Sequence, residues 1–131
     1  LQLQSKPEAP VQVRWDAKRM EQLLSNLLDN SLRYTDAPGQ VFVQVQGDGD
    51  QVIIIVEDTV PGLPPIDLMR IFEPLYRADP ARGREAGGSG LGLAICQKIA
   101  HAHHGVIRAK ASTKGGVQFL IELPSDGDKE A

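Results

Sequence analysis

The longest apolar run in the chain is Val52-Ile53-Ile54-Ile55-Val56, and it limits what the chain can fold into. A membrane-spanning helix needs roughly 20 apolar residues, so this run is too short to cross a bilayer and instead predicts a buried strand. The preceding stretch 41–45 alternates like a strand, and Gly47-Asp48-Gly49-Asp50 lies between the two. Glycine and aspartate favour turns, so the two stretches together predict a β-hairpin.

Two longer segments have the periodicity of helices. After Asp16, which can cap a helix, apolar residues recur at helical spacing from Met20 to Leu28, Ser31 continues the spacing, and together they predict a helix of about five turns. A second amphipathic helix is predicted from Gly90 to a C-cap at Gly105. The other expected elements are short strands at 11–15, 106–111 and 116–123 and a short helix at 66–72.

The order of these elements favours a two-layer fold. Strands and helices do not alternate regularly, so we expect an α+β sandwich with a mixed, mostly antiparallel sheet packed on helices, rather than a doubly wound sheet. With 131 residues, of which 41% are hydrophobic, the chain can form one domain with a core. We expect this domain over residues 1–124, followed by a disordered polar tail over 125–131.

Composition argues against some classes of function. The net charge of −3 is unlike that of a general nucleic-acid binder, which would carry a basic face. The single cysteine, Cys96, cannot form a disulfide within the chain, fits a reducing compartment and is expected to be a buried thiol in the second helix. Because the sequence begins with leucine, we interpret it as part of a longer protein, which could itself be membrane-bound.

Four glycines crowd into the segment Gly87-Gly88-Ser89-Gly90-Leu91-Gly92 just before the second helix. A dinucleotide-binding fingerprint would need a further glycine where Leu93 stands, and the Gly-Lys-Ser/Thr ending of a P-loop is absent. Two interpretations remain: a purely structural loop, or backbone N–H groups of residues 90–93 that hold a phosphate at the helix N-terminus. The preceding residues 77–90, rich in Arg, Gly and Pro, are expected to form a mobile loop.

Polar residues on the first helix and at the end of the apolar strand are candidate ligands. Asn26, Asn30 and Arg33 follow i, i+4, i+7 spacing, so we expect them on one helix face, roughly opposite the leucine stripe. An asparagine amide oxygen can ligate Mg²⁺ beside phosphates. Asp58, at the end of the apolar strand, is either a turn former or a buried acceptor for the amino group of a ligand.

Five segments, in this order, resemble the ATP-binding domain of sensor histidine kinases, which belongs to the superfamily shared with gyrase, Hsp90 and MutL. They are similar to its asparagine box (25–35), first glycine box (58–62), phenylalanine box (71–77), second glycine box (88–93) and last box (114–119). The resemblance covers nearly the whole chain, is strongest to BaeS-type envelope-stress sensors, and implies the Bergerat ATP-binding fold. In the first glycine box, Val60 stands where the family usually has a glycine. In the last box, Val117 stands where the family usually has a threonine, and this second replacement predicts one polar contact fewer.

The resemblance also implies roles for the candidate residues. Asp58 would accept from the adenine amino group and reject guanine, Asn30 would ligate Mg²⁺, and Asn26 would support the metal and phosphates. Arg33 would neutralise phosphate charge, and Tyr34 would pack beside adenine. The other implied ATP contacts are Gly62, Phe72, Arg77, Gly88, Ser89, Gly90, Leu91, Gly92 and Leu93, with Arg82 and Arg84 as further candidates beside Arg77 to grip the γ-phosphate.

The resemblance favours phosphate transfer over hydrolysis. Related ATPases carry a water-activating glutamate four positions before the metal-binding asparagine, and here that position is Asn26. The implied acceptor is a histidine on a separate helical dimerisation domain of the same parent kinase, since His101, His103 and His104 are interpreted as solvated or capping residues. A response regulator would act downstream. The parent is expected to be a homodimer in the bacterial inner membrane, with this domain in the cytoplasm.

Two alternatives to the kinase remain open. The chain could be an ATP-hydrolysing or serine-kinase relative with slow ATPase activity. It could also be a regulatory module that keeps the fold without kinase activity, because Val60 and Val117 depart from the family's pattern.

Overall fold

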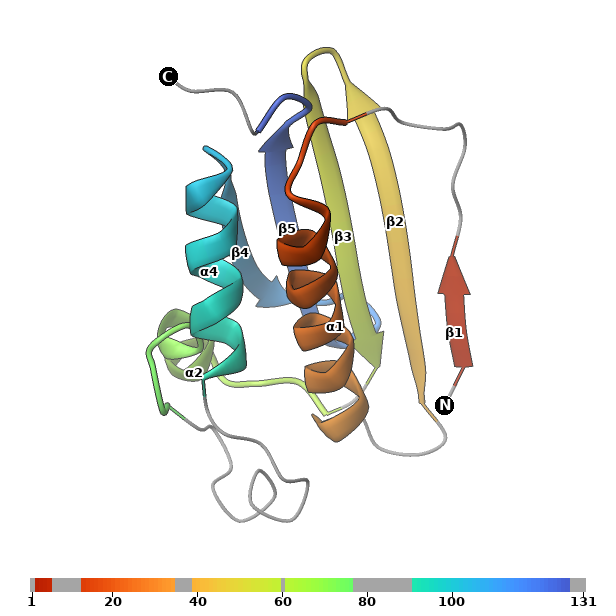
Figure 1. Cartoon of the computed structure of the whole chain (residues 1–131). Helices are drawn as coiled ribbons and strands as arrows, with labels where there is room; N and C mark the ends of the chain where they lie inside the picture. Colours follow the sequence, from red (N-terminus) through yellow and green to blue (C-terminus); the bar gives the residue numbers. More distant parts are fainter. Residues whose placement is uncertain (1, 6–12, 35–38, 60, 77–90, 128–131) are drawn as a thin grey trace.

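The computed structural model describes residues 2–5, 13–34, 39–59, 61–76 and 91–127 (Figure 1). The strands in this part of the chain are β1 (Gln2–Ser5), β2 (Gln40–Asp48), β3 (Gln51–Thr59), β4 (Val106–Ala111) and β5 (Gly115–Pro124). The helices are α1 (Ala17–Tyr34), α2 (Pro65–Arg70) and α4 (Gly92–Ala102). None of these described helices combines the length and apolarity required to span a membrane.

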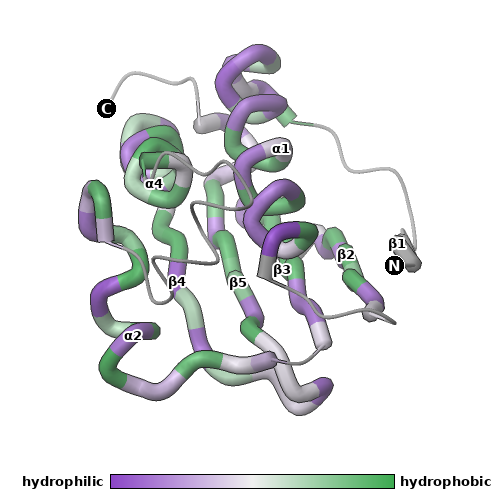
Figure 2. The backbone as a smooth tube through the Cα atoms, turned by 90° about the horizontal axis from the view of Figure 1, so that it is seen from below, coloured by the Kyte–Doolittle hydropathy of each residue, from purple (hydrophilic) through white to green (hydrophobic). Residues whose placement is uncertain are grey.

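The strands form one five-stranded sheet in the order β1-β2-β3-β5-β4. The edge strand β1 runs parallel to β2, and the other neighbouring pairs are antiparallel. Helices α1 and α4 lie side by side over one face of the sheet, and Figure 2 shows the two layers end-on. The predicted α+β two-layer sandwich with a mixed, mostly antiparallel sheet is therefore confirmed.

The predicted hairpin and first helix are both present. Strands β2 and β3 pair antiparallel up to Asp48 and Gln51, and Gly49 makes the turn with a φ of 62°, in the left-handed region that glycine tolerates. Both strands are longer than the apolar stretches that predicted them. Helix α1 contains 18 residues, which corresponds to the expected five turns.

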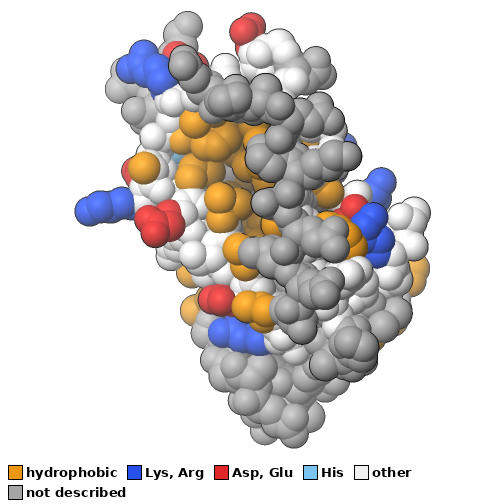
Figure 3. Space-filling model, turned by 90° about the vertical axis from the view of Figure 1, so that its right-hand side faces the viewer, with side chains coloured by type: hydrophobic (Ala, Val, Ile, Leu, Met, Phe, Trp, Pro, Cys, Tyr) orange, Lys and Arg blue, Asp and Glu red, His pale blue; other side chains and the backbone are white. Residues whose placement is uncertain are grey.

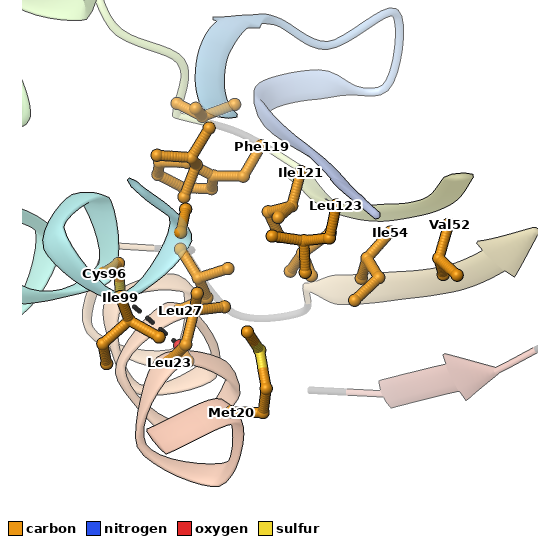
Figure 4. Packing of buried hydrophobic residues seen from close by; sticks show 14 of the residues in the cluster. Met20, Leu23, Leu27, Val52, Ile54, Cys96, Ile99, Phe119, Ile121 and Leu123 are labelled. Carbon is orange, nitrogen blue, oxygen red and sulfur yellow. Dashed lines mark hydrogen bonds between the residues drawn. The ribbon is translucent and has the colours of Figure 1, made fainter. Parts of the chain in front are cut away.

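The core lies between the sheet and the two long helices (Figure 4). Alternate residues of β3 and β5 point toward the helices, because successive side chains of a strand alternate between its faces. Cys96 of α4 is buried against α1, where its thiol donates to the carbonyl oxygen of Leu23 at 3.4 Å. Burial raises the pKa of this thiol to about 12, so Cys96 is the inert buried thiol that was expected. The fully buried core side chains include Leu23, Leu27, Val52, Val56, Ile99, Phe119, Ile121 and Leu123.

The core is less completely covered on the side of β2. Leu24 and Leu28 of α1 and Val43 and Val45 of β2 pack against the core but remain only half-buried. On the side of the molecule that carries β1 and β2 in Figure 1, hydrophobic side chains gather in a central patch (Figure 3). The apolar layer therefore continues to the surface at this edge of the described residues.

Helix α4 ends in a Schellman motif whose left-handed residue is His104, with a φ of 64°. The His104 N–H donates to His101 O at 3.0 Å, and the Gly105 N–H donates to Ala100 O at 2.9 Å. The C-cap is His103, so the prediction that Gly105 is the C-cap is wrong by two positions. Gly105 is needed for a different reason, because a Cβ there would lie 2.3 Å from the carbonyl oxygen of Glu122.

The segment before α1 is held by hydrogen bonds to the end of the sheet and to α4, rather than by forming a strand. Residues 11 and 12 of the predicted strand lie outside the described part, and at Arg14 there is only an isolated bridge to Asp126. Trp15 Nε1 donates to Pro124 O at 2.8 Å, and the Asp16 N–H donates to Nε2 of the buried His103 at 3.1 Å.

Residues 125–127 of the expected tail take part in the same contacts. The Arg14 N–H donates to Ser125 O at 2.7 Å, and the Ser125 N–H donates to Asp50 O at 2.7 Å. Gly127 is buried next to His103 and Trp15. Residues 128–131 lie outside the described part.

Both ring nitrogens of His103 form hydrogen bonds, so we expect this side chain to stabilise the fold. Nδ1 lies 2.9 Å from Ile99 O, to which it donates while Nε2 accepts from Asp16. We expect His103→Ala to lower the free energy of unfolding by about 2 kcal/mol, since it leaves a cavity and two unpaired backbone groups. His101→Ala, at an exposed position of the same helix, should change it by less than about 0.5 kcal/mol. Urea titrations of the two variants test this, and equal midpoints would contradict it.

Candidate functional site

Asp58 continues the row of buried residues on β3. Val52, Ile54 and Val56 point toward the helices, and the next residue of this alternation is Asp58, whose exposed fraction is only 4%. It pairs with Val41 of β2 within the sheet register, so it belongs to the strand and does not form a turn. Of the two interpretations of Asp58, the geometry favours a buried acceptor.

The Asp58 carboxyl is fixed by the backbone of β5. The Val117 N–H donates to Oδ1 at 2.8 Å, and a Cβ at Gly116 would lie 2.0 Å from the same oxygen. The pKa of Asp58 is raised, chiefly because burial removes the carboxylate from water, and the Val117 N–H and the nearby Ser31 hydroxyl partly offset this increase. Among the described residues, the Val117 N–H and the Ser31 hydroxyl are the donors beside this carboxyl, whose two oxygens can accept more hydrogen bonds than these two supply.

The polar residues of α1 lie on its flank, so the prediction that they face roughly opposite the leucine stripe is wrong. A helix turns by about 100° per residue, which places Asn26, Asn30 and Arg33 about a quarter turn from the buried stripe. All three are half-buried, whereas Gln22 and Asp29, on the side away from the sheet, are exposed. The spacing correctly predicts a shared face but does not fix where that face points.

Asn26 joins this flank to the beginning of α4. Its Nδ2 donates to Gly92 O at 3.3 Å, and a Cβ on Gly92 would lie 3.7 Å from Asn26 Cγ. Leu91 directly precedes the helix with an exposed fraction of 40%, and Leu93 packs against the core. The first N–H groups of α4, at the positive end of the helix dipole, therefore lie beside the asparagine flank.

Several predicted site residues cannot be placed. Arg77, Arg82, Arg84, Gly88, Ser89 and Gly90 lie outside the described residues, as do the expected loop 77–90 and Val60. Tyr34 is the last residue of α1, but its side chain is also outside the described part.

The remaining predicted residues meet at one end of the sheet. The C-terminal ends of α1 and β3 and the N-terminal ends of β5 and α4 all lie at the lower end of the molecule in Figure 1. Gly62 approaches β5 closely, since a Cβ there would lie 2.9 Å from Gly115 O. Phe72 packs edge-on against Phe119, with ring centroids 6.2 Å apart, so it anchors the segment after α2 to the core.

Comparison with known proteins agrees with this arrangement. Residues 15–127 match the family described as histidine kinase-, DNA gyrase B- and HSP90-like ATPases. The chain belongs to this ATPase family. Over 128 residues it is 42% identical to the signal transduction histidine-protein kinase BaeS of Escherichia coli strain K12, a match that covers 98% of this chain but 27% of BaeS. The chain therefore spans about a quarter of the length of this relative.

Solved structures of the same ATPase family have the same fold. The nucleotide-free catalytic domain of the histidine kinase ThkA superposes with a TM-score of 0.82 at 27% identity, covering 98% of this chain and 81% of that one. Full-length ShkA in complex with AMPPNP gives a TM-score of 0.79 at 30% identity, covering 94% of this chain and 25% of that one. ThkA is also known in complex with the response regulator TrrA. The prediction of a histidine kinase-type ATP-binding catalytic domain is confirmed.

Two polar groups beside Asp58 in this ATPase domain were missed or undervalued from the sequence. Ser31 was assigned only to the buried stripe of α1, yet its hydroxyl is buried beside the Asp58 carboxyl. The available signal was a serine in a row of leucines. The backbone N–H of Val117 was not considered from the sequence, yet it donates to Asp58 while the Val117 side chain joins the core.

Proposed function

We propose that this domain binds ATP with the adenine amino group on Asp58 and the phosphates between α1 and the start of α4. The observation that carries the proposal is a carboxyl that is only 4% exposed at the end of β3 and has Oδ1 held by the Val117 N–H. An amino group can donate to Oδ2, whereas guanine would present a carbonyl oxygen to the same carboxylate. Such a mismatch can discriminate on the order of 10⁴-fold.

The flank of α1 would hold the phosphates and their metal. No described residue hydrogen-bonds to the half-buried Asn30 side chain, so its amide oxygen is available as a hard oxygen ligand for Mg²⁺. When bound, Mg²⁺ would neutralise phosphate charge. Arg33 would add positive charge, Asn26 would support the metal and phosphates, and the N–H groups at the start of α4 would contact phosphate oxygens. Arg77 would grip the γ-phosphate.

The proposed reaction is transfer of the γ-phosphoryl group to a histidine on a helical dimerisation domain of the parent kinase. The bond from phosphorus to the bridging oxygen of ADP breaks, and a bond from phosphorus to an imidazole nitrogen forms. The domain's own His103 is buried and hydrogen-bonded through both nitrogens, so it is not the acceptor. Asn26 cannot act as a general base, and its amide is engaged with Gly92, which disfavours hydrolysis. Phosphoryl transfer needs mainly positioning and charge stabilisation.

The parent protein would place this domain in a signalling pathway. We propose that it is a homodimer anchored in the bacterial inner membrane, with this domain on the cytoplasmic side and a response regulator as the final phosphate acceptor. The support is the similarity to BaeS and to ThkA, which has been solved with a response regulator.

Substitutions of Asn30 test both the proposed Mg²⁺ site and the proposed phosphoryl transfer. We expect Asn30→Ala to lose the increase in AMPPNP affinity that Mg²⁺ produces, by roughly 10-fold or more, and to abolish transfer from labelled ATP to the parent's helical domain. Asn30→Asp keeps an oxygen ligand and should retain the metal dependence of binding. Calorimetric titrations with and without Mg²⁺ measure this. Equal metal dependence in wild type and Asn30→Ala would contradict the assignment.

A further inference from the structure

The helix layer of the domain is narrower than the sheet that it covers. Neighbouring strands lie about 4.8 Å apart and packed helices about 8–10 Å apart, so one helix covers about two strands. Helix α4 lies over β4 and β5, and α1 lies over β3. Among the described residues, no helix lies over β2 and β1 at the other edge (Figure 2). The five-stranded sheet therefore leaves a width that matches one further helix.

The side chains of β2 on this uncovered side are apolar. Val43 and Val45 pair with Val56 and Ile54 of β3, whose buried side chains point toward the helices, so both valines point to the same side of the sheet. They remain only half-buried. The hydrophobic patch in Figure 3 lies on this face of the molecule.

Helix α1 presents a row of leucines to the same side. Leu24, Leu28 and Leu32 follow i, i+4, i+8 spacing and form a ridge about a quarter turn from the buried stripe. Asn26 lies on the opposite flank, where its amide binds α4, so the leucine ridge faces away from α4 and toward β2. Leu24 and Leu28 are half-buried, and Leu32 is 56% exposed. An i±4 ridge of this kind packs into the groove of a neighbouring helix.

The leucine ridge and the two valines together form an edge patch, consisting of Leu24, Leu28, Leu32, Val43 and Val45. We propose that the edge patch binds an amphipathic helix of the parent protein, from the segment that precedes residue 1. The match to the ThkA catalytic domain covers 98% of this chain but 81% of that domain, so about a fifth of that domain has no counterpart here, which is enough for a helix. The inference takes from the proposed function only that the chain is part of a longer kinase.

The position of β1 explains why the helix would come from the preceding segment. Strand β1 begins at Gln2, runs parallel to β2 from Gln40 onward and forms the edge of the sheet (Figure 1). A helix before β1 can therefore reach the edge patch through a short turn and would run antiparallel to β1. The other end of the described chain lies beside α4, because Gly127 is packed against His103. A helix after Gly127 would have to cross both α4 and α1 to reach the same surface.

The test lengthens the chain at its N-terminus by roughly 30 residues of the parent sequence, enough for a helix of four or five turns and a connection. The longer chain should melt roughly 5 °C or more above the chain 1–131, because the edge patch becomes buried. The added residues should be protected from amide hydrogen exchange over a helical stretch. Helices of this length are marginal on their own in water, so that protection would require packing.

Leu32→Glu assigns the effect to the edge patch. In the chain 1–131 this substitution should change the melting temperature by less than about 2 °C, because Leu32 is 56% exposed there. In the longer chain it should remove most of the increase, because it places a carboxylate under the added helix. Met69→Glu, at a position of α2 that is 85% exposed, is the matched control and should affect both chains equally.

Three results would overturn the proposal. The first is a longer chain that melts with the chain 1–131 and leaves its added residues unprotected. The second is an equal effect of Leu32→Glu on both chains, which would place the added helix elsewhere. The third is a dimer of the chain 1–131 in sedimentation that Leu32→Glu dissociates and the added residues leave intact, which would assign the edge patch to a second copy.

Titration of both chains with AMPPNP separates this inference from the proposed function. A longer chain that is stabilised through the edge patch but does not bind AMPPNP would support the added helix and contradict the ATP site. Binding of AMPPNP by both chains without any stabilisation of the longer one would support the ATP site and overturn the added helix.

Discussion

Replacing Asp58 with asparagine is expected to weaken binding of an ATP analogue by about 100-fold or more while the domain stays folded. An asparagine can still accept from the Val117 N–H through its oxygen. Its amide group would then occupy the position of Oδ2 and face the adenine amino group, donor against donor. Because the site is buried, water cannot compensate for this mismatch.

The same variant should improve the relative affinity for guanine, whose carbonyl can accept from the new amide. Glu57→Gln is the matched control. Glu57 lies on the other face of β3 and accepts from Ser112 Oγ at 2.7 Å, away from the core side that carries Asp58. This control should bind adenine nucleotide within about 2-fold of wild type. Calorimetry with adenine and guanine analogues measures both effects, and unchanged adenine binding by Asp58→Asn would contradict the assignment.

The Asp58→Asn variant also has a pH signature in the absence of nucleotide. The pKa of Asp58 is raised above its ordinary value of 3.8, chiefly by burial, so the folded state prefers the protonated carboxyl. The stability that this group contributes is present below pH 3.8 and is lost as pH rises through the folded-state pKa. Asparagine does not titrate, so the melting temperature of the variant relative to wild type should be higher at pH 7 than at pH 3.5. A difference independent of pH would show that Asp58 is not buried as described.

Gly116→Ala is expected to destabilise the domain severely. A Cβ would lie 2.0 Å from Asp58 Oδ1 and 2.4 Å from the carbonyl oxygens of Asp58 and Thr59. Two of these three atoms are backbone, so β3 and β5 must separate where they pair and where Val117 binds Asp58. We expect the free energy of unfolding to fall by about 3 kcal/mol or more, with nucleotide binding lost as well.

Gly49→Asn is a suitable control for this substitution. Gly49 has a φ of 62° in the β2–β3 turn, nothing lies within 4 Å of a Cβ there, and asparagine tolerates the left-handed region. The control should lose less than about 1 kcal/mol and keep nucleotide binding. Denaturant titration measures both variants. If Gly116→Ala unfolds at the same midpoint as Gly49→Asn, the close approach of β5 to Asp58 is wrong.

The parts of the fold that depend on periodicity could be predicted from the sequence. The alternation in β3 gives the buried face and places Asp58 on it, and helical spacing gives the length of α1 and the shared face of its asparagines. Details set by packing between distant segments could not be predicted. The direction in which the flank of α1 points depends on the position of α4. The left-handed residue that follows α4 is His104, although glycine is the usual choice there.

The structure of the segment before α1 also could not be predicted from the sequence. Its alternation resembled a strand, but Trp15 and the Asp16 N–H instead bind Pro124 and His103, partners about 100 residues away in the chain. The position of Ser31 beside Asp58, which lies on a different element, is another case. Sequence patterns predict which residues share a face of a helix or strand. The residues that this face contacts on other elements are known only from the packed structure.

The most direct test of the ATP site is a calorimetric titration of this chain with AMPPNP and with the corresponding guanine analogue, each with and without Mg²⁺. We predict binding of AMPPNP that is strengthened by Mg²⁺, and guanine binding weaker by several orders of magnitude, because the Asp58 carboxylate meets an amino group in one and a carbonyl in the other. Equal affinity for both nucleotides, or binding of neither, would contradict the assignment of Asp58 as the residue that recognises adenine.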